Sequence, residues 1–181
     1  MGDFMIIGKN LIELALKSGL IYCNPFPKKI TEVSFNVTLG KGAWFNNVNC
    51  IDPQEKAINQ FQWVDNIDNI VLLPDQMIIA HTNEFCGTTV GWLTPQIRSR
   101  STIARWGFEV GTAALFGEPG FHSRWALELH NVTDKPIVIR SGWEVGQLIF
   151  QLTIGNTLYK RQYNVNESEW KPESLLPKIM E

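Results

Sequence analysis

Arginines alternate with hydroxyl-bearing residues in the segment 98–105, which reads RSRSTIAR. Arg100 and Arg105 carry planar guanidinium groups, and Ser101 and Thr102 add neutral hydrogen-bond donors. Each guanidinium can bind two phosphate oxygens at once, so guanidinium groups beside hydroxyls suit a polyphosphate. The pattern therefore indicates a binding site for a phosphorylated ligand.

A candidate proton carrier, Glu128, follows in a segment that has the alternation of a strand. In 124–130, which reads RWALELH, the large apolar residues fall on one face and Glu128 falls on the other. Glycines and a Pro119-Gly120 turn signal separate the two segments, so we expect the chain to double back and bring them together. A carboxylate beside a bound phosphorylated compound can move protons on that compound.

The remaining elements are mostly short strand-like runs separated by turn signals. A short helix is expected over 10–20, where Asn10 is a candidate N-cap and Gly19 a stop. Turn signals at roughly every 8–12 residues predict a β-sandwich, jelly roll or barrel. The segment 46–68 is polar and irregular, which indicates a long loop or insertion. Strands are expected at 32–39, 70–73, 77–82, 88–93, 136–140 and 147–153, with a break at 84–87.

The composition is that of an ordinary globular protein with one domain. Of the 181 residues, 44% are hydrophobic and 19% are charged, and the formal net charge is -2. This charge argues against general nucleic-acid binding, which needs a strongly basic surface, although it allows a local basic patch for a small anion. No apolar run is long enough to span a bilayer and no signal peptide is evident, so we expect a cytoplasmic protein with no membrane partner.

The cysteines and histidines are too scattered to indicate a zinc site. Cys23, Cys50 and Cys86 are far apart and odd in number, which fits a reducing compartment and disfavours a disulfide framework. No CxxC or HxxxH pattern occurs in the sequence. We therefore expect no zinc.

Five short motifs follow one another along the chain in the order found in a known family. The sequence resembles the dCTP deaminase branch of the trimeric dUTPase superfamily through most of its length. Any one motif is a weak signal, and the five in order are a strong one. They are SFNVTLG at 34–40, LP…AHTNE at 73–84, RSTIAR at 100–105 before Gly107, EPGF at 118–121 with LE at 127–128, and GQLIF at 146–150.

The resemblance implies a mainly β fold, a distorted jelly-roll β-barrel with a short N-terminal helix. It implies assembly as a homotrimer with active sites between subunits. The β domain would span 1–158, and 159–181 would form a tail that closes over bound nucleotide.

The implied reaction is hydrolytic deamination of dCTP to dUTP, with Mg²⁺ bound through the triphosphate. In that family the glutamate that matches Glu128 is the general acid/base, and the residues matching Ser101 and Arg105 bind phosphate or order the catalytic water. The chemistry agrees, because one carboxylate can carry protons while water adds at C4, N3 is protonated and ammonia leaves. The signature of zinc-dependent deaminases, HxE…PCxxC, is absent from the sequence. The resemblance also implies substrate contacts at Arg100, Thr102, Ala114, Glu118, Gln147 and Tyr159.

Three departures from the family pattern leave other functions open. Asn36 stands where an aspartate is usual, and Glu118 replaces the aspartate that activates water in dUTP-hydrolysing relatives. Phe116 stands where purely deaminating relatives have arginine and some bifunctional ones have an aromatic residue. The alternatives are a dUTP diphosphatase, a bifunctional enzyme that forms dUMP, and an inactive nucleotide-binding regulatory module. A modified cytosine nucleotide is also open as the substrate.

Overall fold

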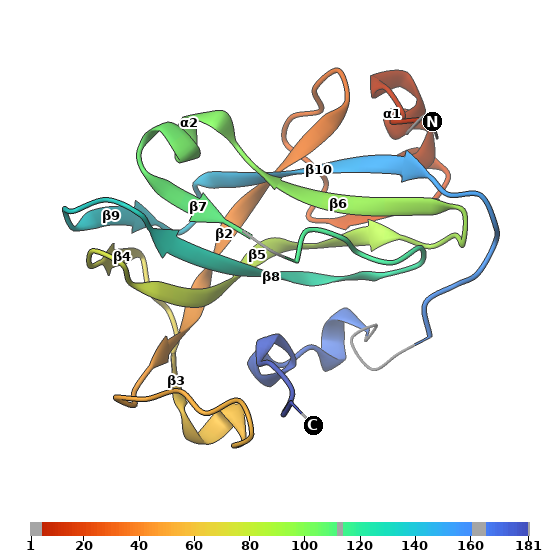
Figure 1. Ribbon diagram of the computed structural model, residues 1–181. Coiled ribbons are helices and arrows are strands. Elements are labelled where there is room, and N and C mark those ends of the chain that lie inside the picture. The colour runs from red at the N-terminus through yellow and green to blue at the C-terminus, as the bar shows by residue number, and fades with distance from the viewer. Residues whose placement is uncertain (1–4, 112–113, 161–165, 181) are drawn as a thin grey trace.

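The computed structural model describes residues 5–111, 114–160 and 166–180, and within them the fold is mainly β (Figure 1). The main sheet has eight strands, and six of them follow the order β6-β10-β2-β5-β8-β7. A further strand, β1, pairs with β5, and β3 pairs with β2. The strands at the two ends of the order, β6 and β7, lie in contact, so the sheet curls into a nearly closed barrel. The main-sheet strands are β1 (Ile21–Asn24), β2 (Ser34–Asn46), β3 (Phe61–Val64), β5 (Met77–Thr88), β6 (Leu93–Ser99), β7 (Phe108–Val110), β8 (His122–Asn131) and β10 (Glu144–Leu152).

The other elements are short and lie around this barrel. Two strands, β4 (Asn69–Leu72) and β9 (Ile137–Arg140), form a separate antiparallel pair. The helices are α1 (Lys9–Lys17) and α2 (Ser101–Arg105), and the 3-10 turns are η1 (Ala57–Asn59), η2 (Glu167–Glu169) and η3 (Pro172–Leu175). No helix in the described ranges is long and apolar enough to cross a membrane.

The predicted mainly β class and short N-terminal helix are confirmed, and four local predictions are wrong. Helix α1 has Gly8 rather than Asn10 as its N-cap. The strand expected at 88–93 is instead a turn between β5, which ends at Thr88, and β6, which begins at Leu93. The break expected at 84–87 does not occur, because β5 runs unbroken from Met77 to Thr88. It absorbs a register shift between His81 and Phe85 and stays paired with β8 on both sides of that shift. The segment expected to be an irregular loop contains β3, which pairs with the end of β2.

At the position of the expected break, β5 carries a buried carboxylate, that of Glu84. The Glu84 side chain is 6% exposed and accepts hydrogen bonds from the Thr38 backbone amide at 2.8 Å and the Thr38 hydroxyl at 2.7 Å. These bonds join β5 to β2 near the point where the register between the two strands shifts. A side chain therefore replaces the backbone hydrogen bonds that the shift interrupts.

Replacing Glu84 with alanine is expected to destabilise the fold by about 3 kcal/mol, because two buried donors on Thr38 lose their acceptor. Denaturant unfolding followed by fluorescence measures this loss. Glu109→Ala, which removes an exposed carboxylate from β7, is the matched control and should change stability by less than about 0.5 kcal/mol. Equal stability of the two variants would contradict the role given to Glu84.

Candidate functional site

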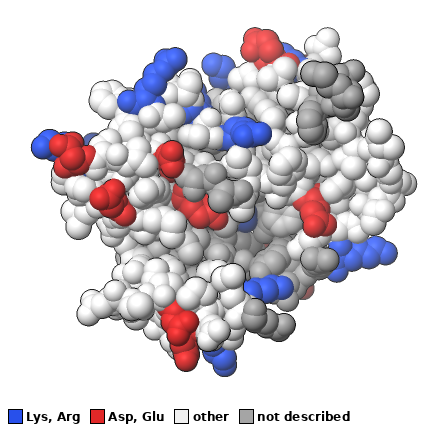
Figure 2. All heavy atoms as spheres, viewed as in Figure 1, with Lys and Arg blue, Asp and Glu red and all other residues white. Residues whose placement is uncertain are grey.

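A cavity of about 740 Å³ opens beside β8 on the side that faces the C-terminal residues. Figure 2 shows the surface hollowed between the barrel and the C-terminal segment, and acidic and basic residues are scattered over this face rather than gathered by sign. The wall comes from five parts of the chain. These are residues 51–61, the β5 residues Met77 and Ile79, residues 114–128, Tyr159, and residues 174–180.

Glu128 lies in this cavity because β8 alternates strictly between two environments. Trp125, Leu127 and Leu129 are at most 4% exposed and belong to the barrel core, and Trp125 also borders the cavity. The intervening residues Arg124, Ala126 and Glu128 lie on the opposite face and line the cavity. The alternation predicted from the sequence is confirmed, and it places the carboxylate on the cavity side.

The Glu128 carboxyl is poorly solvated. Its Oε2 atom is buried and has no hydrogen-bond partner among the described residues. Burial raises the pKa of Glu128 above its ordinary value of 4.5, because the charged form loses its hydration. A carboxyl with a raised pKa can accept a proton and release it again near neutral pH, as general acid/base catalysis requires.

Four other residues singled out in the sequence line the same cavity: Ala114, Phe116, Glu118 and Tyr159. Glu118 is exposed at its rim, one residue before the Pro119-Gly120 turn. The Tyr159 amide donates to the Pro119 carbonyl at 2.8 Å, and its ring packs edge-on against Phe121 with centroids 5.9 Å apart. The turn thus positions both Glu118 and Tyr159.

The arginine-rich segment does not reach this cavity within one chain. Arg100, Ser101, Thr102, Arg105 and Gln147 are not among the residues that line it. The chain doubles back as expected, since β7 pairs with β8, but within a single copy this does not bring the arginine-rich segment to the cavity wall.

The register of β7 explains this separation. Phe108 pairs with Asn131 at the end of β8, so the preceding helix α2 lies beyond that end (Figure 1). Ser101, Thr102 and Arg105 are exposed there.

Arg100 is held by a carboxylate that the sequence did not reveal. Its Nη1 atom lies 2.5 Å from Glu144 Oε2 on β10, and the Asn36 side-chain amide donates to the same oxygen at 2.9 Å. Asn36, which departs from the family's aspartate, thus supports an acid supplied by another strand. Arg98 donates to Gln96 at 3.1 Å.

The sequence also missed two walls of the cavity and one basic residue within it. Residues 51–61 and 174–180 carry no motif, and only the folded chain shows that they face Glu128. Arg124 could have been found, because it lies two and four residues before Ala126 and Glu128 and so shares their face of the strand. Within the described ranges, no cluster of three or more histidine, cysteine, aspartate or glutamate residues could hold a metal ion.

Glu128→Gln is expected to stabilise the protein at pH 7–8, with Tm rising by roughly 2–4 °C. The folded-state pKa is raised, so stability present below pH 4.5 is lost as pH rises through the folded-state pKa. Glutamine stays neutral and avoids this loss, so the difference from wild type should vanish near pH 4. Thermal unfolding across this pH range measures it, with Glu109→Gln as an exposed control. A pH-independent difference would contradict the assignment.

Comparisons with known proteins place this geometry in a family. The family model described as dCTP deaminase-like matches residues 6–153. A protein of Methanopyrus kandleri named "dCTP deaminase, dUMP-forming" is 28% identical over 149 residues, which cover 77% of each chain. A protein of Salinispora tropica with the same name is 29% identical over 172 residues, covering 88% of this chain and 89% of the relative.

Solved structures agree on the fold. The 2'-deoxycytidine 5'-triphosphate deaminase of Agrobacterium tumefaciens superposes with a TM-score of 0.63 at 19% identity, over 82% of this chain and 48% of that one. This chain therefore spans about half the length of that neighbour. A dUTPase of EIAV superposes with a TM-score of 0.50 at 12% identity, over 81% of this chain and 98% of that one. Since the family model matches well over half of its residues, this chain belongs to the dCTP deaminase-like family.

Proposed function

We propose that this protein deaminates dCTP hydrolytically to dUTP and ammonia. The observation that carries the proposal is the Glu128 carboxyl, which lies in a cavity with one oxygen buried and unpaired among the described residues. Burial raises the pKa of Glu128, which suits a group that must take up and return protons in one cycle. Membership of the dCTP deaminase-like family supports the choice of substrate.

Glu128 would carry two protons in each turnover. It takes the first proton from water as the water oxygen bonds to C4 of cytosine, and it delivers that proton to N3. It then takes the proton of the new C4 hydroxyl and delivers it to the amino group. The C4–N bond breaks, ammonia leaves, and the C4 carbonyl of uracil remains.

The charges in the cavity support a site shared between copies of the chain. Four carboxylates line it, from Asp52, Glu55, Glu118 and Glu128, against two cations, from Arg124 and Lys178. A triphosphate needs more positive charge than this balance offers. The exposed helix α2 of a second copy would bring Ser101, Thr102 and Arg105, with Arg100 and Gln147 beside it. Such an arrangement would fit the homotrimer that the family resemblance implies.

Magnesium would arrive with the nucleotide in this proposal. A single carboxylate or two beside a triphosphate is a common setting for Mg²⁺, which binds phosphate oxygens and retains several waters. The oxygens of the triphosphate would hold the ion, and Glu128 would stay free to carry protons. The ion would neutralise phosphate charge, while the protein supplies the proton carrier.

A second reaction, hydrolysis of dUTP to dUMP, is favoured by Glu118. This carboxylate is exposed in the same cavity as Glu128, and the relatives from Methanopyrus kandleri and Salinispora tropica carry the name "dUMP-forming". Glu118 would orient water towards the α-phosphate, while Glu128 would transfer protons at the cytosine ring. Each carboxylate would thus serve one of the two reactions, Glu118 the hydrolysis of dUTP and Glu128 the deamination of dCTP.

Purified protein with Mg²⁺ and dCTP is expected to release ammonia, and Glu128→Gln should lower this rate by about 10²–10⁴-fold while dCTP still binds. Glu118→Gln should abolish pyrophosphate release and leave ammonia release intact. Glu109→Gln is the control for both. Normal deamination by Glu128→Gln would overturn the mechanism, and tight binding of dCTP without turnover by wild type would point to a regulatory module instead.

Arg100 should bind triphosphate only when a carboxylate orients it. Glu144→Gln is therefore expected to raise KM for dCTP by about tenfold, because the Arg100 partner loses its charge. Adding Asn36→Asp to this variant returns a carboxylate to the other side of the same cluster and should restore part of the affinity. Steady-state kinetics measure both changes. An unchanged KM in Glu144→Gln would remove Arg100 from the phosphate site.

A further inference from the structure

Residues 166–180 lie along the side of the barrel that carries the cavity (Figure 1). They are beyond the part of the chain that the family model matches, which ends at residue 153. Their contacts with the barrel fall into three groups: a set of polar bonds around Glu167, a stack of rings around Trp170, and an apolar contact around Leu175. Each group ties a different point of the segment to the sheet.

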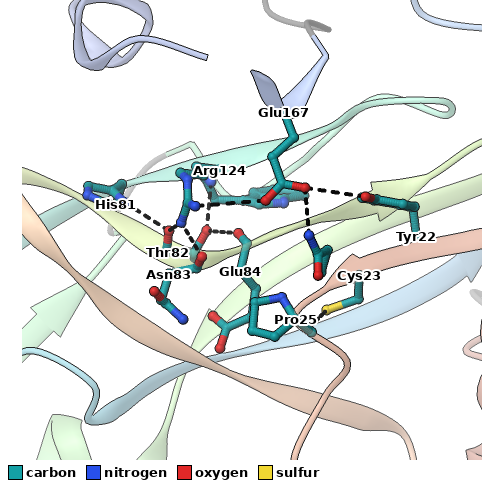
Figure 3. A network of polar contacts seen from close by, with 11 residues as sticks. Tyr22, Cys23, Pro25, His81, Thr82, Asn83, Glu84, Arg124 and Glu167 are labelled. Carbon is teal, nitrogen blue, oxygen red and sulfur yellow. Dashed lines mark hydrogen bonds and ion pairs between the residues drawn. The ribbon is translucent and has the colours of Figure 1, made fainter. Parts of the chain in front are cut away.

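Glu167 is bonded by residues from two strands, as Figure 3 shows. Its Oε2 atom accepts from the Asn24 amide at 2.8 Å and from the Tyr22 hydroxyl at 3.3 Å, both on β1. Its Oε1 atom lies 3.9 Å from Arg124 Nη2 on β8. Both members of this ion pair are less than a third exposed, at 23% and 31% for the side chains, so water screens them less than a surface pair.

Arg124 is itself fixed on the sheet and faces Trp170. Its Nη1 atom donates to the carbonyls of Thr82 and Asn83 on β5. Its guanidinium carbon lies 5.4 Å from the centroid of the Trp170 ring, within the range of a cation–π contact. One side chain thus holds two residues of the C-terminal segment.

Trp170 rests on a stack of rings that begins at Trp63 on β3. Its ring centroid is 5.1 Å from that of His81, and His81 stacks on Trp63 at 6.0 Å and 27°. Gly40 and Gly42 make room for these rings, because a Cβ at either position would lie 2.1 Å from the ring of His81 or Trp63. Burial lowers the pKa of His81, so a neutral ring faces the Arg124 charge at neutral pH.

The end of the segment is anchored by apolar contacts and two backbone acceptors. Leu175 is 8% exposed in a cluster with Trp44 and Phe61. The Trp44 indole donates to the Pro172 carbonyl at 2.9 Å, and the Met180 amide donates to the Pro53 carbonyl at 2.9 Å. Between these anchors, residues 174–178 line the cavity that contains Glu128.

We propose that Arg124 is a positioning residue that fixes residues 166–180 as a standing wall of the cavity before any nucleotide binds. Arg124 shares a face of β8 with Glu128, so the strand that carries the carboxyl also places the wall around it. This differs from a tail that becomes ordered only when it closes over nucleotide. The effect on catalysis rests on the proposed deaminase activity, and the docking of the segment does not.

Hydrogen–deuterium exchange of peptides covering 166–180 tests the docking in the absence of activity. Without nucleotide, the wild-type segment should be protected, and Glu167→Ala should speed its exchange by about tenfold. Glu169→Ala is the matched control, because it removes a carboxylate from the same turn whose side-chain partner among the described residues is Asn166. A wild-type segment that gains protection only when dCTP is added, or equal effects of both variants, would overturn the proposal.

A double-mutant cycle assigns the effect to Arg124. If Arg124 acts in part through Glu167, the double variant Arg124→Ala/Glu167→Ala should exchange more slowly than the product of the two single effects predicts. It should still exchange faster than Arg124→Ala alone, because Tyr22 and Asn24 also bond Glu167. Glu167→Gln keeps an acceptor for Tyr22 and Asn24 and should give an intermediate rate. Independent, multiplying effects of the two alanine substitutions would show that Arg124 does not hold the segment through Glu167.

Kinetics separate a positioning role from a general loss of structure. Glu167→Ala should raise KM for dCTP by about tenfold and leave kcat within about twofold, because Glu167 does not line the cavity. A lower kcat with unchanged KM would contradict the role. If dCTP is not a substrate, the exchange experiment still decides the docking, so failure of the function and failure of this proposal are distinct.

Mixed oligomers show whose cavity the wall serves. Chains carrying Glu128→Gln and chains carrying Glu167→Ala, each with a different tag, are co-expressed and purified through both tags. If each segment serves the Glu128 of its own chain, no site has both parts intact and KM stays at the Glu167→Ala value. Recovery of the wild-type KM would show that the segment crosses to another copy and would overturn the assignment.

Discussion

The strict alternation of β8 is the constraint on which the rest of the structure depends. Its apolar face fills the barrel with Trp125, Leu127 and Leu129. Because successive side chains in a strand point to opposite faces, the other face must carry Arg124 and Glu128 together. Core packing on one side of the strand therefore fixes the geometry of the cavity on the other.

The same constraint separates the acidic and basic halves of the proposed site. Glu128 sits in the middle of β8, while the pairing of β7 with the end of that strand carries helix α2 away from the cavity. An acidic cavity and an exposed cluster of arginine and hydroxyl groups on one chain are complementary surfaces. Assembly would bring the charge that binds phosphate to the carboxyl that moves protons, and a lone chain would have neither complete.

At Glu128, the proposed catalytic function and the stability of the fold oppose each other. Burial of the Glu128 carboxyl, whose Oε2 atom has no partner among the described residues, costs stability and raises its pKa, which suits proton transfer. The buried acid Glu84 has the opposite design, since both of its oxygens accept hydrogen bonds from Thr38. The two carboxylates, in neighbouring strands, differ because Thr38 supplies donors to both oxygens of Glu84, whereas Glu128 Oε2 has no donor among the described residues.

Features that follow from the order of residues along short segments could be predicted from the sequence. The alternation of 124–130, the mainly β class and the order of the family motifs can all be read from neighbouring residues, and the structure and the family match confirm them. An alternation of apolar and polar residues can be recognised without knowing which strands pair, because it shows which face of a strand lies against apolar surroundings.

Contacts between residues far apart in the sequence became visible only in the folded chain. Arg100 pairs with Glu144, Glu167 reaches Asn24 and Arg124, and residues 51–61 and 174–180 form two walls around Glu128. Between 43 and 143 residues separate the members of these pairs, and no periodic pattern links them. Such contacts follow from how the sheet curls and closes. Closure depends on the summed packing of all its strands, so no single segment of the sequence encodes it.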